Sequence, residues 1–100
     1  MVKKIIWTPE AQETYQNIIS YLLENWSEKE IEKFVSITEK IIESIAHQPL
    51  MFRRSEKYNF HEAVITKHNI LIYVVKTDCI DLISFWDTRQ NPVRKIKLLK

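Results

Sequence analysis

The chain begins with a short apolar run and continues with a stretch in which apolar residues recur every three or four positions. Residues 3–7 (KKIIW) have the pattern of a short strand. Thr8-Pro9-Glu10 then supplies an N-cap, a proline at the first helical position and an early acid. The apolar positions that follow are Ala11, Tyr15, Ile18, Ile19, Leu22, Leu23 and Trp26. This spacing predicts an amphipathic helix with one apolar face.

A second amphipathic stretch starts after Asn25-Trp26. Ser27 and Glu30 have the spacing of a capping box, in which each side chain binds a backbone N–H near the start of the helix. The apolar stripe comprises Ile31, Phe34, Val35, Thr38, Ile41, Ile42 and Ile45, and it stops before Pro49. So short a break between two long helices predicts an antiparallel helical hairpin.

Three apolar runs rich in β-branched residues follow, at 60–67, 70–76 and 79–86. Because only a few polar residues separate them, we expect an antiparallel meander of three strands. With no glycine available, the first turn is expected to centre on His68-Asn69, with Asn69 at positive φ.

The residues between the second helix and this meander, 47–59, are expected to form a loop. Met51 and Phe52 are expected to lie against the core, and Arg53 and Arg54 to point outward. The predicted order is therefore β-α-α-β-β-β. It describes an α+β fold in which a helical hairpin packs on a small antiparallel sheet.

The length and composition fit one domain over residues 1–100. Hydrophobic residues make up 45% of the chain, which is enough to form a core. The single cysteine, Cys79, excludes an intramolecular disulfide and is expected to be a small core residue. No apolar run approaches the roughly 18–20 residues that span a bilayer, and there is no signal-peptide pattern. We therefore expect a cytoplasmic protein with no membrane partner.

Glycine is absent from the chain. Phosphate-binding loops, the dinucleotide fingerprint and the EF-hand loop all need conformations or close approaches that glycine supplies. Enzymes that bind nucleotide cofactors through those motifs are thereby excluded, and no cofactor is expected.

Charge is distributed unevenly along the chain. Residues 1–50 carry five Lys and eight Glu, a net charge of −3, whereas residues 51–100 carry ten Lys or Arg and five acids, a net charge of +5. The last twelve residues contain five bases and no acid: Arg89, Arg94, Lys95, Lys97 and Lys100. A one-sided basic surface is typical of proteins that contact phosphate backbones, but a basic terminus also commonly serves solubility alone. Charge by itself leaves both readings open.

Four polar residues on or beside the predicted sheet are candidates for chemistry. Without a metal, a histidine or lysine (His61, Lys67 or His68) could act as acid or base on a ribose hydroxyl while Arg89 stabilises the phosphate. The plainer alternatives are that His68 is a polar turn residue and that Arg89 forms a salt bridge with Asp87. The two histidines lie at opposite ends of one expected strand, so no metal site is predicted.

Three short motifs occur in an order that is typical of one protein family. They are the opening Trp7-Thr8-Pro9-Glu10-Ala11, Lys67-His68-Asn69 with Tyr73 in the meander, and the closing Asp-x-Arg-x-Asn-Pro at residues 87–92. This order resembles the RelE/ParE superfamily of bacterial toxins, over nearly the whole chain. The resemblance implies a cytoplasmic toxin that arrests growth and is neutralised by a cognate antitoxin.

The resemblance leaves the target open between two branches. One branch cleaves messenger RNA in the ribosomal A site with basic residues, and often a C-terminal tyrosine, on the concave face of the sheet. The other branch poisons DNA gyrase and is not a nuclease. This chain departs from the nuclease pattern, because His61 stands at the place of an arginine, Glu62 follows it, and no tyrosine follows Tyr73. The long helical hairpin and the Arg-x-Asn-Pro ending resemble the ParE-like branch.

Three functions therefore remain: a toxin that acts on gyrase, a ribosome-dependent endonuclease, and an inactive toxin that only binds its antitoxin or represses transcription. Whether the chain is an enzyme depends on this choice. For the first function, the expected target-binding residues are Arg89, Arg94, Lys95 and Lys97. The antitoxin is expected across the helical hairpin or against an open sheet edge, in a hetero-oligomer.

Overall fold

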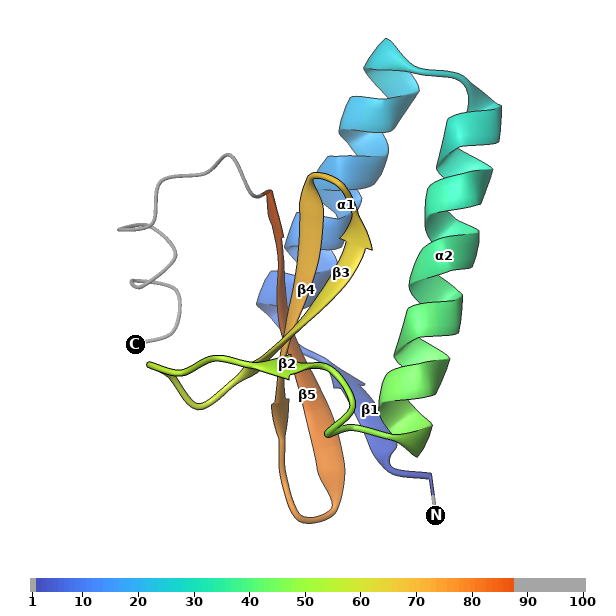
Figure 1. The fold of residues 1–100 in the computed structure, drawn as a ribbon. Coiled ribbons are helices and arrows are strands. Elements are labelled where there is room, and N and C mark those ends of the chain that lie inside the picture. Colours follow the sequence, from blue (N-terminus) through green and yellow to red (C-terminus); the bar gives the residue numbers. More distant parts are fainter. Residues whose placement is uncertain (1, 88–100) are drawn as a thin grey trace.

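The computed structural model describes residues 2–87, in which two helices cover one face of a five-stranded sheet (Figure 1). The helices are α1 (Pro9–Asn25) and α2 (Glu28–His47). The strands are β1 (Lys4–Trp7), β2 (Arg53–Arg54), β3 (His61–Thr66), β4 (Asn69–Val75) and β5 (Cys79–Asp87). The predicted α+β class and helical hairpin are confirmed.

The sheet is mixed rather than wholly antiparallel, so this part of the prediction was wrong. Its strand order is β1-β5-β4-β3-β2, and β1 runs parallel to β5, with Lys4 opposite Cys79 and Trp7 opposite Leu82. Parallel neighbours need a long connection that crosses over the sheet. The helical hairpin is part of that connection. The predicted meander of β3, β4 and β5 is confirmed, with strand bounds one residue or so from those expected.

The loop and the first turn differ from the prediction in detail. β2 is a strand that was not predicted, and it pairs with β3 inside the expected loop. Thr66 pairs with Asn69, so the turn centres on Lys67-His68, and none of the described residues has a positive φ. A register shift between Val64 and Thr66 provides the added local twist instead.

Side-chain burial in the expected loop is also only partly as predicted. Phe52 packs against the core, and Arg53 and Arg54 are exposed, as expected. Met51, however, is exposed. It lies in a bend beyond the C-terminal end of α2, where no described element covers it.

The two helix starts behave differently. Thr8 caps α1 as predicted, because its Oγ1 accepts a hydrogen bond from the N–H of Ala11 at 3.1 Å. Ser27 occupies the N-cap of α2, but its side chain makes no capping bond, so the capping box was wrong. Glu28 and Glu30 still favour the start of α2, because acids interact well with the positive end of a helix.

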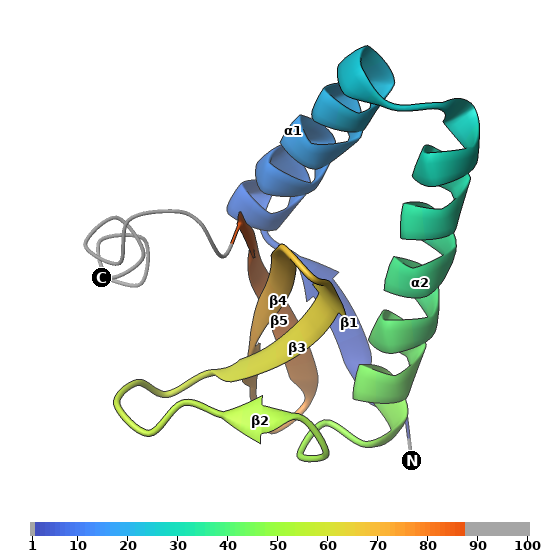
Figure 2. The ribbon, with the colours of Figure 1, turned by 45° about the horizontal axis from the view of Figure 1, so that its top comes forward.

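Two of the apolar positions predicted for the core side of α1 lie in solvent. Leu23 and Trp26 are exposed. Figure 2 shows that both helices run away from the sheet toward the connection between them. At that end α1 has no sheet to pack against, so the apolar stripe extends beyond the core.

Threonine hydroxyls of α1 complete the edge of β5 that β1 leaves uncovered. β1 pairs with β5 only as far as Leu82. At that point the N–H and the Oγ1 of Thr8 both donate to the Leu82 carbonyl, at 3.3 and 2.6 Å. Further along, the N–H of Phe85 donates to Oγ1 of Thr14 at 2.9 Å. The start of α1 is therefore bonded directly to β5.

The side chains that face the helices form the main core. At its centre four aromatic rings are in contact, with centroid distances of 5.0–5.7 Å: Trp7, Tyr15, Phe34 and Phe85. The opposite face of the sheet carries a second apolar group, which we call the outer cluster. It consists of Phe60, Ile72 and Trp86, with Tyr58, Ile70, Val74 and Ile83 packed against them.

His61 lies in the main core at the β2 side of the sheet. It is 7% exposed, and its ring stacks on that of Tyr73 at a centroid distance of 5.3 Å. Tyr73 is itself fixed by a 2.7 Å hydrogen bond from its hydroxyl to the carbonyl of Pro49. Burial raises the pKa of Tyr73 to about 12. Burial, and next the positive charge of Arg54, lower the pKa of His61 from its ordinary 6.5.

Replacing Thr14 by valine is expected to lower the free energy of unfolding by about 1–3 kcal/mol, because the N–H of Phe85 then loses its acceptor. Thr14→Ser is the matched control, since it keeps the hydroxyl. Chemical denaturation of the three proteins measures the effect. Equal stability of the serine and valine variants would contradict this role for the hydroxyl.

His61 is expected to make stability depend on pH. Because its pKa is lowered in the folded state, the unfolded chain binds the proton more readily. The stabilising contribution is present above pH 6.5, the ordinary pKa, and is lost as pH falls through the lowered pKa of the folded state. Denaturation between pH 7.5 and 5 should therefore show a steeper fall for the parent than for His61→Gln. An equal dependence of stability on pH in the two proteins would contradict this expectation.

Candidate functional site

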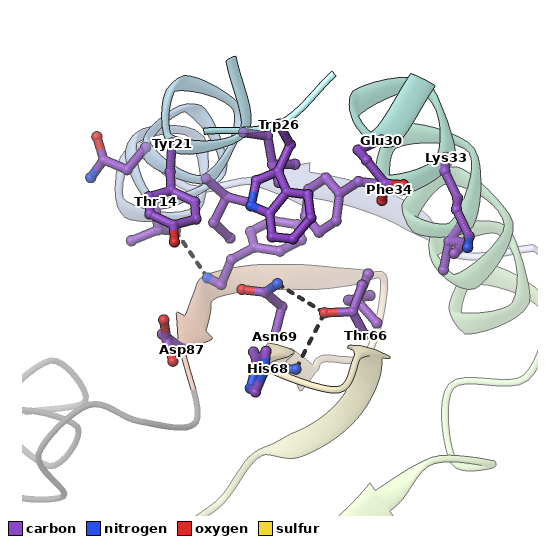
Figure 3. A pocket seen from close by; sticks show the side chains of 16 residues that line it. Thr14, Tyr21, Trp26, Glu30, Lys33, Phe34, Thr66, His68, Asn69 and Asp87 are labelled. Carbon is purple, nitrogen blue, oxygen red and sulfur yellow. Dashed lines mark hydrogen bonds between the residues drawn. The ribbon is translucent and has the colours of Figure 1, made fainter. Parts of the chain in front are cut away.

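A cleft of about 660 Å³ opens between the two helices and the β3–β4 turn (Figure 3). Side chains from both helices and from the sheet form its apolar floor: Ile18, Leu22, Phe34, Ile37, Ile65 and Phe85. The cleft exists because α1 and α2 diverge from the sheet while the bonds of Thr8 and Thr14 hold the start of α1 on β5. Its apolar floor makes it the first candidate for a binding site.

Two large aromatic side chains stand at the helical end of the cleft. Tyr21 and Trp26 line it and are 52% and 59% exposed. Figure 3 shows the Trp26 ring over the opening, between Tyr21 on α1 and Phe34 on α2. Exposed aromatic residues beside an apolar hollow are typical of surfaces that bind another protein. Sequence reasoning placed Trp26 on the apolar face of the first helix and assigned no binding role to Tyr21, so it missed both as site residues.

The rest of the rim is polar and carries both signs of charge. Glu30 and Lys33 of α2 stand on one side, with His68 and Asp87 on the other. The turn that carries His68 is held by Thr66, whose Oγ1 accepts hydrogen bonds from the N–H of His68 and the Nδ2 of Asn69 at 3.3 and 2.9 Å. A partner protein with an apolar strip flanked by charged residues would complement the apolar floor and the charged rim of the cleft.

The structure separates His61 from the other two described nuclease candidates, Lys67 and His68, which lie together in one turn. His61 is buried and faces the helices at the start of β3, whereas Lys67 and His68 are exposed in the turn after its other end. His68 lines the cleft, and His61 is not among the lining residues. The remaining candidates, Arg89, Arg94, Lys95 and Lys97, lie outside the described residues.

The outer face of the sheet offers carboxylates around its apolar cluster. In the antiparallel register Glu62 lies opposite Ile72, and Asp81 lies opposite Val74, so both acids share the face of the outer cluster. Asp81 forms an ion pair with Lys76, with 2.6 Å between Nζ and Oδ2. The hydrogen bond and charge of Asp81 raise the pKa of Lys76.

Residues 2–87 contain neither a metal-binding cluster nor a membrane-spanning helix. No group of three or more His, Cys, Asp or Glu side chains in this range could hold a metal ion. No helix in the same range has the length and apolar character needed to cross a membrane. Cys79 is a half-buried free thiol, 3.8 Å from Oδ1 of Asp81.

The chain matches the sequence model of a known family over residues 5–92, that of the ParE toxin of type II toxin-antitoxin system, parDE. None of the curated proteins compared with it is a match by sequence. Three solved structures are similar in fold.

The chromosomal ParDE system from P. aeruginosa gives a TM-score of 0.74 at 13% identity, covering 88% of this chain and 98% of that one. The YoeB/ParE toxin from Agrobacterium tumefaciens gives 0.61 at 12% identity, covering 84% and 96%. The YoeB-YefM complex from Staphylococcus aureus gives 0.56 at 19% identity, covering 86% and 97%.

At these identities the structures show a shared fold, and the family match supplies the assignment. The match covers the first strand, both helices and the whole meander. The resemblance to the RelE/ParE superfamily is thus confirmed. The chain belongs to the ParE toxin family and is the toxin component of a type II toxin–antitoxin system.

Proposed function

We propose that this toxin inhibits DNA gyrase through its basic C-terminal residues and does not cleave RNA. The observation that carries the proposal is the separation of His61 from Lys67 and His68: His61 lies inside the core, and the other two lie at the far end of β3. Inhibition by docking needs a surface of suitable shape and charge but no converging acid and base.

The position of His61 argues against a role in RNA cleavage. A general acid or base must come within hydrogen-bond reach of the ribose hydroxyl, and this ring is covered by the core and stacked on Tyr73. Its lowered pKa also keeps it neutral near pH 7, so it would not attract a phosphate. A nuclease role for His61 would require the β2 side of the sheet to open.

The part of the outer face that residues 2–87 form also fits RNA poorly. The nuclease branch acts with basic residues on its concave sheet face, whereas this outer face presents the outer cluster with Glu62 and Asp81 beside it. Carboxylates repel a phosphate backbone, and an apolar surface offers it no hydrogen bonds.

We also propose that the cognate antitoxin occupies the cleft between the helices. Its apolar floor, its exposed Tyr21 and Trp26 and its mixed-charge rim suit an amphipathic segment of a partner chain. Trp and Tyr are the residues that most often dominate the energy of protein interfaces. The similarity to structures of toxin–antitoxin complexes supports the existence of such a partner.

Purified toxin is expected to inhibit gyrase supercoiling, and Arg94→Ala with Lys95→Ala and Lys97→Ala is expected to weaken this inhibition about tenfold, at roughly 0.5 kcal/mol for each charge removed. The matched control removes three exposed lysines elsewhere: Lys29, Lys40 and Lys57. Supercoiling assays over a range of toxin concentrations measure the half-inhibitory value for each protein.

Two results would overturn the gyrase proposal. Intact supercoiling, together with A-site cuts on translating ribosomes that Arg89→Ala abolishes, would identify the ribosome-dependent nuclease. Intact supercoiling with harmless overexpression in the absence of antitoxin would instead identify an inactive toxin that only binds its partner or represses transcription.

Trp26→Ala is expected to weaken binding of the cognate antitoxin by about 2 kcal/mol, or roughly thirtyfold in Kd. The fold should be retained because the side chain is 59% exposed. Leu50→Ala is the matched control, since Leu50 is also exposed but does not line the cleft. Calorimetric titration with purified antitoxin measures both affinities. A weakening for Leu50→Ala alone would place the antitoxin elsewhere on the toxin.

A further inference from the structure

The outer cluster is buried although both helices lie on the other face of the sheet (Figure 1). Ile72 has no exposed surface, and Phe60 and Trp86 are 3% exposed. Phe60 meets Trp86 edge-on at 5.8 Å and stacks on Tyr58 at the same centroid distance. These contacts explain the burial of only one side of the cluster, the side toward the loop that follows β2.

An antiparallel sheet with helices on one face usually presents polar side chains on the other. Here the central strands β4 and β5 are apolar on both faces, with Ile70, Ile72 and Val74 outward on β4 and Ile83 and Trp86 outward on β5. Of the described residues outside the strands, Tyr58 and Phe60 are the ones that pack on this face. So apolar a face is typical of a surface covered by a further segment.

The residues that follow β5 continue directly from the outer cluster. β5 ends at Asp87, directly after Trp86 of the outer cluster, and thirteen residues follow it. Thirteen residues can extend roughly 40 Å, more than enough to cross the sheet. The stretch contains four aliphatic residues: Val93, Ile96, Leu98 and Leu99.

Charge supports the same pairing. Glu62 and Asp81 share the face of the outer cluster, where Asp81 also pairs with Lys76 and Arg53 lies opposite Glu62. The thirteen residues after Asp87 contain five bases and no acid. A segment with aliphatic and basic residues complements an apolar surface that has carboxylates at its margin. The hairpin cleft is a weaker match, because its rim carries Lys33 and His68 beside the acids Glu30 and Asp87.

We propose that the outer cluster is the docking surface for residues 93–100 of this same chain. The aliphatic side chains of this segment cover Ile72 and Trp86, and Arg94, Lys95 and Lys97 are presented on the sheet face opposite the helices. The segment thereby completes a second small core and fixes the basic residues in position. This docking does not depend on which target the toxin has.

Disulfide trapping in the full chain tests the proposal. Cys79→Ser removes the native thiol, Ile83→Cys places one cysteine in the outer cluster, and Ile96→Cys, Leu98→Cys or Leu99→Cys supplies the second in turn. Tyr21→Cys replaces Ile83→Cys in the matched control, since Tyr21 lies at the hairpin cleft. Rates of disulfide formation within one molecule are measured at low protein concentration and normalised to the reactivity of each thiol.

At least one pair that includes Ile83→Cys is expected to close about tenfold faster than the same tail cysteine with Tyr21→Cys, because docking raises the effective concentration. Faster closure with Tyr21→Cys would place the segment in the cleft and overturn the proposal. Equal rates would show an undocked segment, and disulfides between molecules would show that a second copy covers the cluster. Either result overturns it as well.

A substitution that leaves the fold intact gives an independent readout. Ile96→Ser with Leu99→Ser is expected to shift the emission of Trp86 to longer wavelength and to increase its quenching by acrylamide severalfold, measured in a background of Trp7→Phe and Trp26→Phe. Lys97→Ser is the control within the same segment and should leave Trp86 shielded. Unchanged quenching in the double serine variant would contradict the docking.

Discussion

The fold depends on what pairs with the backbone groups of the long strand β5 along the edge that faces away from β4. β1 covers only the first part of that edge, and beyond Leu82 the partners are hydroxyl groups of the helix that follows β1. The Oγ1 of Thr8 accepts a hydrogen bond that caps α1 and donates one to β5. One side chain therefore starts the helix and fixes it to the sheet. Because these bonds fix the start of α1, the divergence of the hairpin from the sheet, and hence the cleft, follows from them.

Most of the fold could be predicted from local patterns. The periodicity of the apolar residues predicted both helices, and the short polar breaks predicted the meander from β3 to β5. The parallel pairing of β1 with β5 could not be predicted this way, because it joins residues more than seventy positions apart and depends on the handedness and length of the hairpin crossover. The two-residue strand β2 is too short to have a pattern.

The residues of the candidate site were harder to predict from the sequence than the fold, for a related reason. Periodicity shows which residues share a face of a helix but not where the helix leaves the sheet. Leu23 and Trp26 fit the apolar stripe of α1 and yet lie in solvent. His61 was singled out for its chemistry, but alternation along β3 places it inward with Ala63 and Ile65. The register, which decides this, was not specified by the sequence pattern alone.

In the two proposals, antitoxin binding and target binding use opposite faces of the sheet. One face, with the helices, offers an apolar cleft with exposed aromatic residues, and the other carries an apolar cluster beside the end of β5, from which the basic residues continue. An antitoxin segment bound only in the cleft would leave the opposite face open. Neutralisation then requires the antitoxin either to extend around the end of β5 or to block the target by bulk. Because Asp87 lines the cleft and follows Trp86 of the outer cluster, the end of β5 is the shortest route between the two surfaces.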